Sequence, residues 1–166
     1  MNKIFIGIGS NLGNRLTNLK IVVNKISLIK TIELISQSKV YESEPMYYVN
    51  QNFFLNMVIE INSSDEPLKL LEILKNIEYS IGRTSNQMHN HPRIIDLDIL
   101  DYSNCIINES DLKLPHPKFK ERLFVLKPWN DIAPNHVVSD SKLTIYDLML
   151  LLDSNNKFVK LYVNNI

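Results

Sequence analysis

Hydrophobic and polar residues follow two different periods along this chain, and the changes of period divide it into elements. Alternating or short continuous apolar runs predict strands at residues 3–10, 34–43, 53–61 and 93–102. Apolar residues spaced by three or four predict helices at residues 13–29 and 63–82. This order is the split βαβ pattern, so we expect an α+β fold with a ferredoxin-like βαββαβ core, a mainly antiparallel sheet backed by two helices.

The C-terminal part predicts additional helices after this core. An extended pair is expected at 105–114, a short helix at 119–126, a proline-bounded turn at 127–134 and a further helix at 144–152. Thr144 is the expected cap of the last helix, and Asp65, followed by Pro67, is the expected cap of the helix at 63–82. No linker or repeat interrupts the pattern, so residues 1–166 are expected to form a single domain.

Composition narrows the classes of function. Eighteen basic and eighteen acidic residues cancel, which argues against a nucleic-acid partner. Cys105 is the only cysteine, and the N-terminus enters a strand pattern without a signal segment, so we expect a cytoplasmic protein. The longest apolar run, Leu148 to Leu152, is too short for a membrane span. No strong apolar stripe is left over in the sequence, which favours a monomer.

Three of the four glycines lie within seven residues, where the first strand meets the first helix. Gly7, Gly9 and Gly13 predict either close approach of the backbone to another group or unusual backbone dihedrals. A plain tight turn is the alternative, because the spacing matches neither the phosphate-loop pattern nor the dinucleotide-binding one.

Two aspartates interrupt the predicted strand at 93–102. Because side chains alternate along a strand, Asp96 and Asp98 project to the same face about 7 Å apart. Two neighbouring carboxylates are costly to bury unless protons, hydrogen bonds or cations compensate them. Oxygen-only ligands favour Mg²⁺ or Mn²⁺, and proteins commonly hold Mg²⁺ together with substrate phosphates. The spacing therefore indicates metal-assisted phosphoryl or nucleotidyl transfer, and the alternative is a pair of solvated surface acids.

Cationic side chains flank the aspartates in two separate segments. These residues are suited to polyphosphate oxygens, although ordinary surface charge is the alternative for each: Arg83, Arg93, His116, Lys118, Lys120 and Arg122. A zinc site built from His89 and His91 with the aspartates is disfavoured, because no cysteine supports it.

An ordered set of motifs resembles a known family. "GSNLGNR", "FLN", "IGR", "PRIIDLDIL", "LPHPKFKERLFVL" and "IAP" occur in the order found in the 6-hydroxymethyl-7,8-dihydropterin pyrophosphokinases of folate biosynthesis. The resemblance runs from about residue 3 to about residue 150 and agrees with the ferredoxin-like expectation. It implies transfer of the diphosphate of ATP to the hydroxymethyl group of the reduced pterin, which gives AMP and the pterin diphosphate.

The resemblance also implies roles for individual residues. Asp96 and Asp98 would bind two Mg²⁺ ions, with Arg83 and Arg93 as further catalytic residues at the phosphates. ATP contacts are implied for a second group, in which Ile99 would contact adenine through its backbone: Glu78, Ile99, His116, Lys120 and Arg122. Pterin contacts are implied for a third, in which the two aromatic rings would stack on the flat pterin: Ser43, Met46, Phe54, Asn56 and Phe124.

The loop before "PR" departs from the family pattern. The family commonly has a second basic residue, a tryptophan and a glycine where this chain has Ser85, Asn90 and His91. The loops at 43–52 and 83–92 are expected to close over the substrates and keep out water. We therefore expect weaker ATP binding or slower closure, unless His89 or Tyr48 substitutes. Unchanged ATP affinity and turnover in Asn90→Trp would refute this expectation.

Other functions fit part of the pattern. A palm-type nucleotidyltransferase also places two aspartates on such a sheet, although neutral charge and small size argue against a polymerase. An RNA-binding module of the same topology would need an exposed aromatic and basic sheet face, which the strands lack. The remaining alternative is a catalytically weak or silent relative that binds ATP and pterin without releasing AMP.

Overall fold

A computed structural model describes residues 1–46, 50–83, 91–103, 105–153 and 158–166. The order of elements begins with β1 (Asn2–Ser10), α1 (Arg15–Ser27), β2 (Ile32–Gln37), β3 (Val40–Ser43), β4 (Phe54–Ser63) and α2 (Pro67–Ser80). It continues with β5 (Asp96–Tyr102), β6 (Ile107–Asn108), β7 (Lys113–Leu114), the 3₁₀ turn η1 (Phe119–Glu121), α3 (Leu123–Ile132), α4 (Ile145–Asp153) and β8 (Val159–Val163). None of the helices in these residues is long and apolar enough to cross a membrane.

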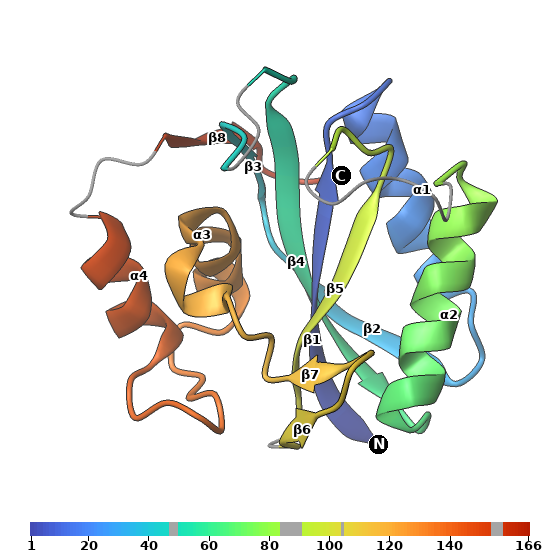
Figure 1. Cartoon of the computed structure of the whole chain (residues 1–166), viewed down its shortest axis with the longest axis vertical. Helices are drawn as coiled ribbons and strands as arrows, with labels where there is room; N and C mark the ends of the chain where they lie inside the picture. The colour runs from blue at the N-terminus through green and yellow to red at the C-terminus, as the bar shows by residue number, and fades with distance from the viewer. Residues whose placement is uncertain (47–49, 84–90, 104, 154–157) are drawn as a thin grey trace.

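The main sheet has the strand order β5-β1-β4-β3-β8, with β2 also paired to β4. Each pairing that the described residues make in it is antiparallel. β1 therefore lies inside the sheet, with β4 on one side and β5 on the other (Figure 1). The expectation of a mixed α and β fold with a mainly antiparallel sheet is confirmed.

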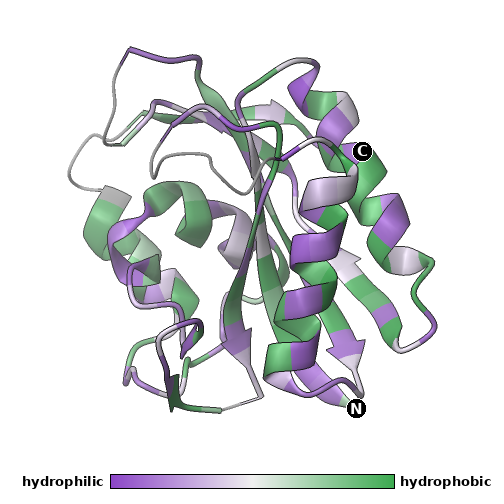
Figure 2. Ribbon diagram, turned by 45° about the vertical axis from the view of Figure 1, so that its right-hand side comes forward, coloured by the Kyte–Doolittle hydropathy of each residue, from purple (hydrophilic) through white to green (hydrophobic). Residues whose placement is uncertain are grey.

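Helices cover both faces of the sheet, which creates two hydrophobic cores. α1 and α2 pack on one face (Figure 1), where β1, β4 and β5 contribute side chains such as Ile6, Ile59 and Leu97. α3 and α4 cover the other face, and the core there is built around Phe5 and Trp129. Figure 2 shows α2 with apolar and polar stripes, as expected for a helix with one buried side.

The predicted strand at 34–43 is interrupted, and this expectation was wrong in detail. β2 and β3 both pair with β4, and Ser38 lies in the break between them. The Ser38 N–H donates to the carbonyl of Val58 at 2.9 Å, and its hydroxyl oxygen accepts from the Val58 N–H at 2.9 Å. A side chain that takes over ladder hydrogen bonds ends one strand and allows the next to begin.

The N-termini of α4 and α2 test the two N-caps predicted from sequence. Thr144 and Asp147 form reciprocal hydrogen bonds at the start of α4, as expected for a capping box. The predicted cap Asp65 was wrong, because Glu66 occupies the N-cap position of α2 without a side-chain bond. Asp65 instead accepts hydrogen bonds from the hydroxyls of Thr31 and Ser63.

The predicted turn at 127–134 was also wrong, because α3 continues to Ile132 with Pro128 inside it. A proline in a helix interior removes one backbone hydrogen bond and normally ends the helix. Here Trp129 is fully buried against Phe5 and Phe119, so core packing outweighs the local cost.

β8, which the sequence pattern did not predict, pairs with the edge of β3.

Candidate functional site

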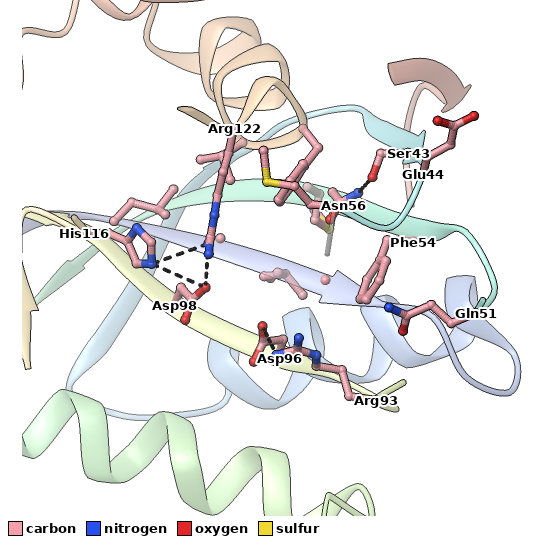
Figure 3. A pocket seen from close by; sticks show the side chains of 18 of the residues that line it. Ser43, Glu44, Gln51, Phe54, Asn56, Arg93, Asp96, Asp98, His116 and Arg122 are labelled. Carbon is pink, nitrogen blue, oxygen red and sulfur yellow. Dashed lines mark hydrogen bonds and ion pairs between the residues drawn. The ribbon is translucent and has the colours of Figure 1, made fainter. Parts of the chain in front are cut away.

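A cavity of about 280 Å³ lies on the α3 side of the sheet, where β1, β3, β4, β5 and the start of α3 meet (Figure 3). Residues far apart in sequence line it. The residues predicted from sequence that the structure brings together here are Ser43, Met46, Phe54, Asn56, Arg83, Arg93, Asp96, Asp98, His116, Arg122 and Phe124.

Glycines form the floor beneath the two aspartates. Gly7 pairs directly with Asp98, and Gly9 pairs with Asp96. Directly opposed residues in an antiparallel pair share a face, so both glycines face the cavity. A Cβ at Gly9 would lie 3.4 Å from Asn56 Oδ1. The glycines leave the floor open, which supports the expected close approach, and Gly13 has a positive φ of 63°.

Asp96 is held between two arginines. The Arg83 guanidinium donates to Oδ1 at 2.8 Å, and that of Arg93 donates to Oδ2 at 2.8 Å. Burial alone would raise the pKa of Asp96, but the positive charges of Arg93 and Arg83 outweigh burial and hold this pKa below its ordinary value. Asp96 is therefore ionised at neutral pH.

Asp98 has the opposite balance. Burial and the negative charge of Asp96 raise the pKa of Asp98 to about 6. Arg122 Nη1 lies 3.6 Å from Asp98 Oδ2, and His116 Nε2 lies 4.0 Å from the same oxygen (Figure 3). The two carboxylates lie on one face as predicted, yet they differ in protonation behaviour.

His116 is neutral, and each of its two ring nitrogens lies near a donor. Burial and the charge of Arg122 lower the pKa of His116 to about 4. The Lys118 backbone N–H donates to Nδ1 at 3.1 Å, and the Arg122 guanidinium lies 3.4 Å from Nε2. Nε2 also lies 4.0 Å from Asp98 Oδ2, at the edge of the cavity.

Glu78 lies behind the cavity wall rather than in its lining. Its carboxylate is fully buried, and Oε1 accepts from the Leu97 N–H at 2.7 Å and from the Arg83 guanidinium. Oε2 accepts from Lys75 at 2.9 Å. Glu78 thus orients Arg83 and Lys75 from the side of α2, which differs from a direct ATP contact.

A second part of the cavity combines an amide with aromatic rings. Asn56 is buried and donates to the Ser43 hydroxyl at 2.9 Å. Phe54 and Phe124 both line the cavity. The Arg93 guanidinium carbon lies 5.9 Å from the centre of the Phe54 ring, and an equivalent contact of 5.8 Å joins Arg122 to Phe124. Both aromatic rings therefore lie next to arginine side chains that line the cavity.

Apart from Glu78, three of the predicted phosphate or ATP contacts do not line the cavity: Ile99, Lys118 and Lys120. Lys120 forms an ion pair of 3.0 Å with Asp140 and does not belong to the lining. The Ile99 side chain is buried in the core under α1 and α2. The lid positions Tyr48, Ser85, His89 and Asn90 lie outside the described residues.

Sequence reasoning missed Lys75, Gln51 and Asn11. Lys75 lines the cavity and lies one helical turn before Glu78, a spacing that could have identified it. Gln51 also lines the cavity and accepts a hydrogen bond from the buried Asn11 at 2.8 Å. Asn11 accepts from the Arg93 N–H at 2.7 Å and so fixes the approach to β5. Long-range contacts of this kind have no local sequence signal.

The donor set fits Mg²⁺ bound together with a phosphate substrate. Among the described residues no group of three or more His, Cys, Asp or Glu could enclose a metal. Asp96 and Asp98 are two carboxylates on one face beside four cationic side chains. Mg²⁺ keeps several waters and uses one or two carboxylates plus substrate oxygens, which matches such an open pair. Each carboxylate oxygen of Asp96 has a further lone pair beyond its arginine bond.

Relatives of the chain are identifiable by sequence. A 2-amino-4-hydroxy-6-hydroxymethyldihydropteridine pyrophosphokinase of Bacillus subtilis is 41% identical over 134 residues, which cover 80% of each chain. The enzyme of that name from Methylorubrum extorquens is 32% identical over 92% of this chain and 95% of its own. The Dictyostelium discoideum folic acid synthesis protein FOL1 is 40% identical over 82% of this chain, which spans 20% of that longer protein.

The fold is shared with a solved structure. The crystal structure of wild-type Plasmodium falciparum HPPK-DHPS superposes with a TM-score of 0.74 at 17% identity, over 93% of this chain and 45% of that one. Residues 5–134 match the model of 7,8-dihydro-6-hydroxymethylpterin-pyrophosphokinase (HPPK). This match covers the carboxylate pair, the arginines and the amide–aromatic subsite, and we conclude that the chain belongs to the HPPK family.

Proposed function

We propose that this chain transfers the diphosphate of ATP to the hydroxymethyl group of 6-hydroxymethyl-7,8-dihydropterin, a step of folate biosynthesis. The observation that carries the proposal is one cavity with two chemically different halves. Asp96, Asp98 and four cationic side chains form one half, which suits a metal-bound triphosphate. The buried Asn56–Ser43 pair and two phenylalanines form the other, which suits a flat heterocycle with a polar edge.

The residues divide the work of such a transfer. Asp96 and Asp98 would hold two Mg²⁺ ions, which neutralise phosphate charge and polarise the phosphoryl oxygens when bound. Arg83, Arg93 and Arg122 supply permanent positive charge for phosphate oxygens, and His116 adds a neutral imidazole beside them. Phosphoryl transfer depends chiefly on positioning and charge stabilisation, so the hydroxyl proton can pass to solvent or to a phosphate oxygen without a dedicated general base.

Further features belong to the same proposal. The sheet order, with the first strand between the last and the third of the core, supports a ferredoxin-like βαββαβ arrangement in one domain over residues 1–166.

Lys120 and the Ile99 backbone remain candidate ATP contacts that substrate binding would have to recruit. We also propose a monomer that acts in the cytoplasm on small-molecule substrates, without nucleic acid or membrane.

Product analysis tests the proposal. The purified chain is incubated with ATP, Mg²⁺ and 6-hydroxymethyl-7,8-dihydropterin, and AMP and ADP are quantified with and without the pterin. Pterin-dependent AMP in equal amount to pterin diphosphate is expected. ADP would identify a monophosphate kinase, pyrophosphate release would point to a nucleotidyltransferase, and ATP binding without turnover would identify a silent relative.

A further inference from the structure

The C-terminal strand β8 borders the pterin subsite although it lies outside the matched family region, which ends at residue 134. β8 pairs with the edge of β3, and Val159 is the partner of Ser43 in that pairing. On its other side Ser43 pairs with Phe54. β3 is therefore held between two strands at the residue that accepts the Asn56 hydrogen bond.

A second cavity, of about 320 Å³, adjoins the first. The two cavities share Ser43, Glu44, Met46 and Phe124. Phe158 and Val159 contribute to the wall of the second cavity. The C-terminal strand thus lines space next to the residues expected to hold the pterin ring.

Phe158 makes a specific contact at this border. Its ring centre lies 5.5 Å from that of Phe53, with the ring planes tilted by 55°. Phe53 immediately precedes Phe54, which lines the first cavity. Phe158 is 41% exposed, so burial in a core does not account for its position. The Lys127 ammonium also donates to the Val159 carbonyl at 3.4 Å, which links β8 to the helix that carries Phe124.

We propose that the start of the C-terminal strand positions the pterin subsite, through Val159, the first residue of β8, and Phe158, which directly precedes it. Phe158 braces Phe53 and thereby the neighbouring Phe54, and the pairing of Val159 with Ser43 keeps the Ser43 hydroxyl within reach of Asn56. This inference rests on the proposed function, because it assigns the subsite to the pterin. Such a residue affects pterin binding and leaves ATP binding and the transfer step unchanged, because Phe158 lies outside the carboxylate half.

The test compares Phe158→Ala with Leu161→Ala in the full chain. Both remove an apolar side chain from the C-terminal segment, and Leu161 is 45% exposed but belongs to the lining of neither cavity. The measurements are the pterin Kd by fluorescence, KM for pterin and for ATP, kcat and the thermal midpoint. For Phe158→Ala we expect pterin Kd and KM to rise about fivefold, with kcat and the ATP KM unchanged. Leu161→Ala should match the wild type, and Phe158→Tyr should restore pterin binding.

The outcomes separate this inference from the proposed function. Wild-type AMP formation with equal pterin Kd in Phe158→Ala and Leu161→Ala overturns the role of β8 and leaves the function standing. Equal losses of ATP and pterin binding, with a lower thermal midpoint, would show a merely structural strand and also overturn it. Pterin binding by the wild type without AMP overturns the function, and the Kd comparison still decides the role of β8. Absence of pterin binding overturns both.

Discussion

Asp96 and Asp98 are two residues apart on β5, and their surroundings shift their pKa values in opposite directions. Asp96 accepts a hydrogen bond from an arginine on each oxygen, at 2.8 Å. Asp98 instead has one arginine at 3.6 Å and a neutral histidine at 4.0 Å. The D-x-D spacing alone predicted that both side chains share a face. The difference between them could not be predicted, because Arg83 and Arg122 reach the site from other elements.

The raised pKa of Asp98 predicts a pH-dependent effect of Asp98→Asn. The folded-state pKa of about 6 exceeds the ordinary value of 3.8, so the contribution of Asp98 to stability is fully present below about pH 4 and is lost as the pH rises through 6. The asparagine variant does not ionise. Relative to the wild type it should gain about 1 kcal/mol in free energy of unfolding between pH 4 and pH 7, a value reduced because the carboxylate is 38% exposed.

Urea unfolding without Mg²⁺, at several pH values in this window, measures that gain. A difference between variant and wild type that stays constant from pH 4 to pH 7 would contradict the electrostatic description of Asp98. Asp140→Asn is a suitable control, since Asp140 forms its ion pair with Lys120 outside the cavity.

Glu78 and Glu72 allow a matched comparison on α2. Each accepts from a lysine three residues earlier at 2.9 Å, but Glu78 is fully buried and Glu72 is 60% exposed. Glu78→Gln leaves Arg83 and Lys75 without their buried counter-charge and should lower the free energy of unfolding by about 3 kcal/mol. Glu72→Gln should leave the unfolding midpoint nearly unchanged.

Denaturant unfolding of both variants gives the comparison, and the KM for ATP adds a functional measurement. We expect that KM to rise in Glu78→Gln alone, because Arg83 loses the group that orients it. Similar stabilities of the two variants would mean that the buried carboxylate does not anchor the site.

At the level of elements, the sequence predicted the strands and helices that bury one face, because their apolar residues recur with a regular period. β4 alternates between the two cores, so its period of two is visible in sequence. The break at Ser38 was not predictable, because it depends on a hydrogen bond to β4. The continuation of α3 through Pro128 depends on the burial of Trp129, and β8 depends on the exposed edge of β3. These features are decided by tertiary contacts that outweigh local preference.

A substitution in the interior strand β1 tests the account at the scale of elements. A methyl group in Gly9→Ala would meet Asn56 Oδ1 at 3.4 Å and Phe54 at 3.9 Å, so the strand can accommodate it with little strain. It would, however, occupy the cavity floor. We expect the KM for pterin to rise about tenfold while the thermal midpoint changes little. A lower midpoint without any change in pterin KM would show that Gly9 serves the sheet rather than the site.

At the scale of the whole molecule, the cavity forms where segments distant in sequence meet over the sheet. Eleven of its lining residues are singled out from the sequence, the aspartates and the cationic side chains by their chemistry and the pterin contacts by the family resemblance. Neither signal identifies Gln51 or Lys75, which reach the cavity through the fold.

Size measurement tests the monomer expectation. Apolar side chains are exposed on α4, such as Leu150, and on β8, such as Tyr162. Exposed apolar side chains that gather into a patch can pair copies of a chain. We expect light scattering after size-exclusion chromatography to give a mass near 19.3 kDa at micromolar concentration. A mass twice as large would refute the monomer.

The most direct test of the central claim is the rate of pterin-dependent AMP formation in Asp96→Ala and Asp98→Ala, with Asp140→Ala as the control. Loss of either cavity carboxylate should lower the rate at least about 100-fold, because the charge of the metal-bound triphosphate is no longer held in position. Asp140→Ala should retain the wild-type rate. Substantial AMP formation in either cavity variant would contradict the assignment of the two aspartates to the metal site.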